Sequence, residues 1–182
     1  MPPLRILCVC TGNVCRSPVA ERLLARALGP SVKVTSAGTY ALVGQSLSPP
    51  MDQLVMEGGA EAQGFTARQL SEPYLRQADL VLGMAREHRA AAVDLVPATV
   101  RRSFTLREYA RLLGQIDPEL LPSGSPAERA RASLPLAAAQ RRRAGAAEDD
   151  VADPYRRADT AYAQAFTEIE QAVTSIATVL NG

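Results

Sequence analysis

The sequence predicts an α/β fold: a three-layer sandwich in which helices flank a central four-stranded parallel sheet. Two observations predict it. Short apolar runs alternate with helical patterns along the chain, and the first run, LRILCVC at 4–10, is almost wholly apolar, as in a strand buried on both faces. Alternating strands and helices form right-handed crossovers, and such folds bind ligands at the carboxyl ends of their strands. With 182 residues, the chain has the usual size of a single domain, here 1–182.

The elements follow in order along the chain. Residues 4–10 are expected to form the central strand, with a ligand-binding loop directly after it. Ser17 is the expected cap of the next helix and Pro18 its first residue, and Gly29 with Pro30 ends that helix. Three further strands are predicted at 32–38, 78–84 and, more weakly, 98–104.

The last helix has the clearest pattern, because apolar residues recur every three or four positions from about Asp159 onward. These residues are Tyr162, Phe166, Ile169, Val173, Ile176 and Leu180. Between 114 and 150 the chain is rich in Pro, Ser, Gly, Ala and Arg, which indicates a surface insertion containing one helix. This insertion precedes the late acidic segment and could reshape or cover a site there.

Charge and cysteine content limit the function classes. The net charge of +1 gives no reason to expect nucleic acid or a membrane as partner, and the arginine runs at 141–143 and 156–157 are expected to be solvated. The chain starts without a basic leader and has no apolar stretch of membrane-spanning length, so we expect a cytoplasmic protein. All three cysteines lie within one short segment, which suits a reducing compartment.

The segment CTGNVCR, residues 10–16, has the features of an anion-binding loop. It places a cysteine at the end of a strand and an arginine at the start of a helix, six positions apart. Gly12 and Asn13 tolerate the backbone angles that a tight loop needs. Backbone N–H groups of the loop, which also includes Thr11 and Val14, can surround an oxyanion, and Arg16 adds a planar fork of donors.

The same electrostatic field favours the ionised form of the Cys10 thiol, which could then attack phosphorus. Ser17 can donate its hydroxyl to that thiolate. Cys15 is either loop filler or a partner for a reversible disulfide with oxidised Cys10. Cys8 lies inside the strand and is expected to be a small buried hydrophobic residue.

A metal site does not fit the chain well, because zinc usually takes four Cys or His ligands and His88 is the single histidine beside the three cysteines. We therefore expect no metal and no organic cofactor. His88 lies at a helical start after the third strand, where we interpret it as a surface or packing residue without a catalytic role.

A thiolate that attacks a phosphate ester needs an acid for the departing oxygen. Asp153 in EDDVADPYRR is the candidate, because Pro154 stiffens the turn after it and Tyr155 supplies an aromatic surface. Asp153 would protonate the leaving group and then activate the water that hydrolyses the phosphocysteine.

The two stretches CTGNVCRSP and DPY, in this order, resemble the low-molecular-weight protein tyrosine phosphatase family, and SAG at 36–38 and ADLVLGM at 78–84 fall where that family has strands. The resemblance implies that Cys10 is the nucleophile, Arg16 the phosphate-binding arginine and Asp153 the general acid and base. It further implies that Asn13 shapes the loop, that Ser17 tunes the thiolate and that Cys15 pairs with Cys10 on oxidation. Tyr155 and, by a looser match, Tyr40 would form the walls of the substrate slot.

The implied function is hydrolysis of phosphotyrosine in a phosphorylated protein, with inorganic phosphate or a similar oxyanion as a ligand of the loop. Protein arginine phosphatases share the fold and loop, but tend to have threonine at the position of Val14, whose apolar surface favours phosphotyrosine. Thiol-dependent arsenate reductases need further cysteines beyond Cys15, which the chain lacks. A non-catalytic binder of phosphoproteins remains an alternative, although it would more often lack Cys10, Arg16 or Asp153.

Overall fold

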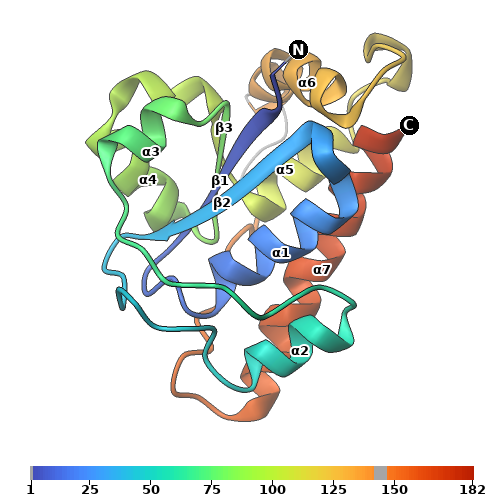
Figure 1. Cartoon of the computed structure of the whole chain (residues 1–182). Helices are drawn as coiled ribbons and strands as arrows, with labels where there is room; N and C mark the ends of the chain where they lie inside the picture. Colours follow the sequence, from blue (N-terminus) through green and yellow to red (C-terminus); the bar gives the residue numbers. More distant parts are fainter. Residues whose placement is uncertain (1, 142–146) are drawn as a thin grey trace.

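The structure, a computed structural model, describes residues 2–141 and 147–182. At its centre lies a four-stranded parallel sheet in the order β2-β1-β3-β4 (Figure 1). The strands are β1 (Leu4–Cys10), β2 (Val32–Gly38), β3 (Leu80–Gly83) and β4 (Ser103–Thr105).

Helices cover both faces of this sheet (Figure 1). One face carries α1 (Arg16–Leu28), α5 (Leu106–Leu113), α6 (Pro126–Arg141) and α7 (Asp159–Asn181), and the other carries α3 (Glu72–Gln77) and α4 (Arg86–Leu95). The shorter α2 (Met51–Glu57) packs beside α1 and α7. The predicted three-layer α/β sandwich is confirmed.

Strand β1 is buried on both sides, as its apolar sequence predicts. Leu4, Ile6 and Cys8 belong to the main hydrophobic cluster, whereas Leu7 and Val9 belong to a second cluster. β1 pairs with β2 along its whole length, from Leu4 opposite Val32 to Cys10 opposite Gly38. Cys10 therefore ends the central strand at the carboxyl edge of the sheet.

Helices α1 and α7 lie against each other on the sheet (Figure 1). α7 begins at Asp159, where its apolar pattern predicts, and buries the side of the helix that carries this pattern. Its buried residues are Tyr162, Ala165, Phe166, Ile169, Ala172, Val173, Ile176 and Leu180.

The start of α1 differs from the prediction. The helix begins at Arg16 with Cys15 at the N-cap position, so Ser17 is inside the first turn and is not the cap. The physical reason is that the Ser17 hydroxyl has other partners, since Cys10 Sγ and the Asn13 amide both lie 2.9 Å from it.

The third and fourth strands are shorter than predicted. β3 spans Leu80–Gly83, and most of the segment predicted as the fourth strand is a 3₁₀ helix, η2 (Pro97–Arg102), with only Ser103–Thr105 extended. The turn is stabilised locally, because Thr99 Oγ1 donates to the Val96 carbonyl and Ser103 Oγ donates to the Thr99 carbonyl. Such short side-chain contacts compete with strand pairing, and apolar periodicity does not reveal them.

In the described residues of segment 114–150, the structure has one α-helix, α6, as expected, and it follows a short 3₁₀ turn, η3 (Pro118–Leu120). Another 3₁₀ turn, η1 (Gly29–Ser31), follows α1. α6 packs against α5 and α7 and buries small residues, namely Ala127, Ala130, Ser133 and Ala137. This part of the segment thus joins the body of the fold.

Arg141, the first residue of the arginine run at 141–143, contacts other side chains and is not only solvated as expected. Arg141 Nε lies 2.6 Å from Glu108 Oε1, and its guanidinium lies 4.2 Å from the centre of the Phe104 ring. Arg142 and Arg143 lie outside the described residues.

Candidate active site

Residues 11–15 form a tight loop between β1 and α1 at the carboxyl edge of the sheet. Asn13 takes a positive φ of 55°, a conformation that asparagine tolerates better than most residues. The loop also lies directly against the end of β2, since a Cβ added at Gly38 would collide with the Thr11 carbonyl oxygen. Glycine at 38 is therefore needed for the loop to approach the sheet.

The Cys10 thiol lies at the base of this loop and is 2% exposed. The Asn13 backbone N–H donates to Cys10 Sγ at 3.3 Å, and Ser17 Oγ lies 2.9 Å from the same sulfur. Since the Asn13 side-chain amide donates to Ser17 Oγ, the hydroxyl proton of Ser17 is free to point at the sulfur. Two donors thus converge on Cys10, an arrangement that stabilises a thiolate.

Asn13 holds this arrangement in place through buried contacts. Its side-chain amide also donates to Ser36 Oγ at 2.9 Å, and its Oδ1 accepts from the Arg68 backbone N–H at 2.9 Å. Ser36 Oγ in turn donates to Glu21 Oε2 at 2.5 Å, and burial raises the pKa of the Glu21 carboxyl. Sequence reasoning missed Ser36 and Glu21, because nothing in the spacing of β2 or α1 marks them as neighbours of the loop.

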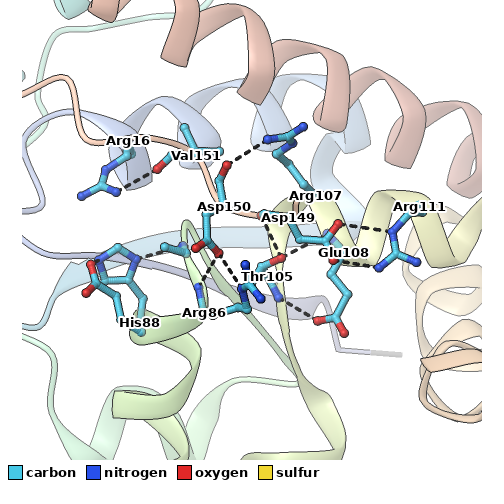
Figure 2. A network of polar contacts seen from close by, with 12 residues as sticks. Arg16, Arg86, His88, Thr105, Arg107, Glu108, Arg111, Asp149, Asp150 and Val151 are labelled. Atoms are coloured by element: carbon cyan, nitrogen blue, oxygen red, sulfur yellow. Dashed lines mark hydrogen bonds and ion pairs between the residues drawn. The ribbon is translucent and has the colours of Figure 1, made fainter. Parts of the chain in front are cut away.

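Arg16 links the loop to the segment before α7. Its guanidinium is almost fully buried; Nη1 donates to the Val151 carbonyl at 3.0 Å, and Nη2 lies 3.2 Å from Asp153 Oδ2. Figure 2 shows Arg16 beside Val151. The structure therefore brings Arg16 and Asp153 together although they lie 137 positions apart in the sequence, the difference between 153 and 16.

A cavity of about 150 Å³ lies over the loop. Its lining comprises Cys10, Thr11, Gly12, Val14, Cys15, Arg16, Tyr40, Leu42, Asp153 and Tyr155. Nine of these were predicted as site residues, whereas the two remaining predicted residues, Asn13 and Ser17, are buried and contact Cys10. Leu42 is the lining residue that sequence reasoning missed.

The two aromatic residues of the lining differ in exposure. Tyr155 is partly buried against the core, whereas Tyr40 is 81% exposed. Tyr40 belongs to the loop after β2, and its backbone N–H donates to the Thr11 carbonyl at 3.0 Å. The cavity therefore has one aromatic wall that is packed and one that is largely free in solvent.

The other two cysteines are buried thiols. Burial, with smaller contributions from Cys10 and Asp153, raises the pKa of Cys15 to about 12. Burial also raises the pKa of Cys8, which lies inside β1 as predicted. Both side chains thus remain protonated at neutral pH and are not nucleophiles in their own right.

The segment that carries Asp153 is held at its base by polar contacts from α4 and α5 (Figure 2). Asp149 forms a two-pronged ion pair with Arg111 of α5, at 2.7 and 3.2 Å. Asp150 Oδ1 accepts from the Arg86 backbone N–H at the start of α4, and the Asp150 carbonyl accepts from Arg107 of α5.

His88 is not a surface residue, because it is 1% exposed and belongs to the first turn of α4. Its Nε2 lies 2.9 Å from Thr11 Oγ1 in the cavity lining. The packing interpretation of His88 is therefore correct, and the surface interpretation is wrong.

Within residues 2–141 and 147–182, no group of three or more His, Cys, Asp and Glu side chains is placed to hold a metal ion. The helices of the described part of the chain are all too short or too polar to cross a membrane.

Comparisons with known proteins give this geometry a context. The sequence model of the family described as "Low molecular weight phosphotyrosine protein phosphatase" matches residues 5–122. The matched range includes the loop and ends before the segment that carries Asp153.

Relatives match over most of the chain. The low molecular weight protein-tyrosine-phosphatase Wzb of Salmonella typhi is 32% identical over 177 residues, which cover 97% of this chain and 94% of Wzb. A protein-arginine-phosphatase of Geobacillus stearothermophilus is 36% identical over 132 residues, covering 72% of this chain and 86% of that protein.

Solved structures agree with these matches. YwlE arginine phosphatase from Geobacillus stearothermophilus superposes with a TM-score of 0.73 at 30% identity, covering 98% of this chain and 94% of that one. The tyrosine phosphatase Wzb from Escherichia coli K30 in complex with phosphate superposes with a TM-score of 0.70 at 26% identity, covering 97% of this chain and 91% of that one.

Proposed function

The chain belongs to the low molecular weight phosphotyrosine protein phosphatase family, and from this premise we propose that it hydrolyses phosphotyrosine in proteins through a phosphocysteine intermediate. The observation that carries the proposal is the shared cavity, where the Cys10 sulfur, the Arg16 guanidinium and the Asp153 carboxylate meet. No cofactor takes part in the proposed reaction.

In the first step, the Cys10 thiolate attacks phosphorus, so that an S–P bond forms while the P–O bond to the tyrosyl oxygen breaks. Asp153 gives its proton to that oxygen. Arg16 and the backbone N–H groups of the loop bind the phosphoryl oxygens, and the guanidinium has donors beyond those used for Val151 and Asp153.

In the second step, water attacks phosphorus and loses a proton to the Asp153 carboxylate, which returns to its acid form. The S–P bond breaks, and its electron pair returns to Cys10 as thiolate. Donors from the Asn13 backbone and the Ser17 hydroxyl stabilise this leaving thiolate. Inorganic phosphate is the product, and it is therefore also a ligand of the loop.

This chemistry needs a reduced thiol, which fits the cytoplasmic location proposed from the sequence. A phosphorylated protein is the partner that the proposal implies. The partly buried Tyr155 and the exposed Tyr40 would contact the phosphotyrosine ring on its two sides.

Phosphoarginine is the second candidate substrate, because a protein-arginine-phosphatase is among the relatives. Val14 favours phosphotyrosine, since it lines the cavity with apolar surface where a guanidinium would need polar contacts. We therefore expect a higher kcat/KM for phosphotyrosine than for phosphoarginine.

The test is phosphate release from matched phosphotyrosine and phosphoarginine peptides, with Cys10→Ser as the inactive control. Release from phosphotyrosine that is abolished in Cys10→Ser would support the proposal, and Val14→Thr should then shift the ratio of kcat/KM values toward phosphoarginine. A preference of the wild-type chain for phosphoarginine would overturn the substrate assignment. Absence of release from either peptide would favour a binding role over a catalytic one.

A further inference from the structure

The single histidine of the chain is buried beside the cavity, where the reaction described above gives it no role. It occupies the first turn of α4, and both of its ring nitrogens have partners. Nδ1 lies 3.0 Å from the Ala85 backbone nitrogen, and Nε2 lies 2.9 Å from Thr11 Oγ1. The ring therefore connects the start of α4 to the loop that carries Cys10.

The partners determine which nitrogen of His88 carries the proton. A backbone N–H can only donate, so Nδ1 must accept from Ala85 and has no proton of its own. In the neutral ring the proton then belongs to Nε2. The position of Glu87 agrees with this, because its carboxylate oxygen, which only accepts, lies 3.4 Å from Nε2.

The tautomer of His88 also determines the direction of the Thr11 hydroxyl. Because Nε2–H donates to Thr11 Oγ1, the oxygen is an acceptor in this contact, and its own proton is directed elsewhere. Thr11 lines the cavity together with Cys10, Arg16 and Asp153. Its hydroxyl is thus a donor available to a bound phosphoester.

The same turn of α4 also holds the acid segment. The Arg86 backbone N–H, two residues before His88, donates to Asp150 Oδ1 at 2.8 Å, and the Val151 backbone N–H donates to the Met84 carbonyl at 2.8 Å. Figure 2 shows His88, Arg86 and Asp150 gathered at this turn. A shift of His88 would therefore displace both the loop at Thr11 and the segment that carries Asp153.

We propose that His88 is a positioning residue of the active site, which fixes Thr11 by its Nε2–H group so that the Thr11 hydroxyl donates to an oxygen of the bound phosphoester. The proposal rests on the phosphatase function proposed above. His88 itself does not contact the substrate and does not transfer a proton to it.

The first experiment reads the tautomer directly in the wild-type chain. Since His88 is the only histidine, ¹⁵N NMR of the imidazole gives a single pair of ring signals. We expect a proton on Nε2 and none on Nδ1 at neutral pH. A proton on Nδ1, or a doubly protonated ring, would overturn the proposal without any substitution and whatever the activity of the protein is.

The second experiment is a double-mutant cycle with an aryl phosphate as substrate. Thr11→Val removes the hydroxyl, and we expect kcat/KM to fall about tenfold, the effect of one lost hydrogen bond to a charged group. His88→Gln should cause a similar loss. If His88 acts through Thr11, adding His88→Gln to Thr11→Val costs little more, whereas two independent losses would multiply to about a hundredfold.

Three controls make the cycle decisive. Thr11→Ser retains the hydroxyl and should retain most of the activity, and Asp94→Asn, an exposed change on α4, should leave kcat/KM unaltered. Urea unfolding of each variant separates a loss of folded protein from a loss of activity. If the losses in the folded variants multiply, or if Thr11→Val is fully active, the positioning role is contradicted. If the wild-type chain itself shows no activity, the proposed function is contradicted instead.

Discussion

Asp153 is the residue whose removal should separate phosphate binding from turnover. Its side chain is 47% exposed, so it can reach a substrate oxygen, and Oδ2 lies 3.2 Å from Arg16. We expect Asp153→Asn to lower kcat by about 10²- to 10⁴-fold, the usual contribution of a general acid. Inorganic phosphate should bind at least as tightly, because the substitution removes a negative charge next to Arg16. The measurements are kcat and the inhibition constant of phosphate.

The choice of substrates sharpens this test. An acid matters most for a leaving group of high pKa, so the loss should be larger for phenyl phosphate than for a nitrophenyl phosphate. Glu148→Gln, an exposed change five residues earlier, is the matched control and should retain wild-type kcat. An equal loss for both substrates would assign Asp153 a structural role and leave the acid unidentified.

His88 should make the stability of the fold depend on pH. Burial, together with the positive charge of Arg16, lowers the pKa of His88 to about 4 from 6.5, although the carboxylates of Asp153 and Asp150 oppose the shift. Below the unfolded pKa the unfolded chain binds a proton that the folded chain does not, so stability falls as pH decreases, until the folded pKa is reached. We expect a loss of about 2 kcal/mol between about pH 7 and about pH 5.

Urea unfolding at the two pH values measures this dependence, with His88→Gln as reference. The variant is expected to be less stable at neutral pH, but the difference from wild type should shrink on acidification. A difference that stays constant with pH would show that His88 titrates alike in the folded and unfolded chains.

At the scale of residues, the sequence predicts the side chains that the proposed reaction requires. It does not predict the side chains that come close to the loop only when the chain folds. Cys10 and Arg16 are recognised because one loop fixes their separation, and Asp153 because that loop chemistry requires an acid. Ser36, Glu21 and the contact of His88 with Thr11 come from other elements. No spacing in the sequence marks these contacts, since they depend on register and packing.

Among the elements, the segment before α7 is held in position by contacts with other elements and not by regular secondary structure of its own. It is irregular from Ala147 to Ala158, yet Asp149 is nearly buried in its two-pronged pair with Arg111. The pair with Asp149 also raises the pKa of Arg111. We infer that this contact fixes where Asp153 can lie.

The substitution Asp149→Ala tests this anchor. It should destabilise the fold by about 1–3 kcal/mol, because a largely buried charged hydrogen-bond partner is lost, and it should lower kcat about tenfold by loosening the acid segment. Asp94→Ala, on the exposed side of α4, is the control and should change neither quantity. Urea unfolding and kcat with an aryl phosphate are the two measurements. A destabilised variant with wild-type kcat would show that Asp153 does not need this contact.

Helix and strand boundaries show where periodicity is informative. α7 was predicted well because a long helix repeats its apolar pattern many times. β4 was not, since an apolar stretch of a few residues fits a turn as well as a strand. The hydrogen bonds of Thr99 and Ser103 stabilise the 3₁₀ turn η2 in most of the segment predicted as this strand. The Ser17 error has a similar origin, because a serine before proline fits a cap until Cys10 provides its hydroxyl with another partner.

On the scale of the whole molecule, the order β2-β1-β3-β4 places the loop after β1 at the centre of the carboxyl edge. The fold was predictable because strand patterns, turns and helix ends all favour the same alternation. The packing of α6 was not, because its buried residues are small and its contact with α5 includes a buried hydrogen bond of 2.7 Å between Tyr109 and Ser133 and the ion pair of Arg141 with Glu108. Sequence patterns of large apolar residues cannot reveal such an interface.

Phosphate binding should stabilise the whole chain, because the loop, α1 and the segment before α7 meet at Arg16. A ligand that binds only the folded state raises the free energy of unfolding by mass action, by about 2.7 kcal/mol at about 100 times its dissociation constant. Thermal unfolding with increasing phosphate, compared with sulfate and chloride at equal ionic strength, measures this effect.

Two variants assign the stabilisation to the loop. Cys10→Ser should keep the phosphate-dependent rise in Tm, because it removes the nucleophile without removing the donors around the anion. Arg16→Ala should abolish the rise; its Tm without phosphate will also be lower, since Val151 and Asp153 lose their partner, so only the increments are compared. If phosphate raised the Tm of Arg16→Ala as much as that of the wild type, the anion would bind outside the loop and the role of Arg16 would be contradicted. The reason is that the loss of a guanidinium that bridges both sides of the cavity must weaken a phosphate site there.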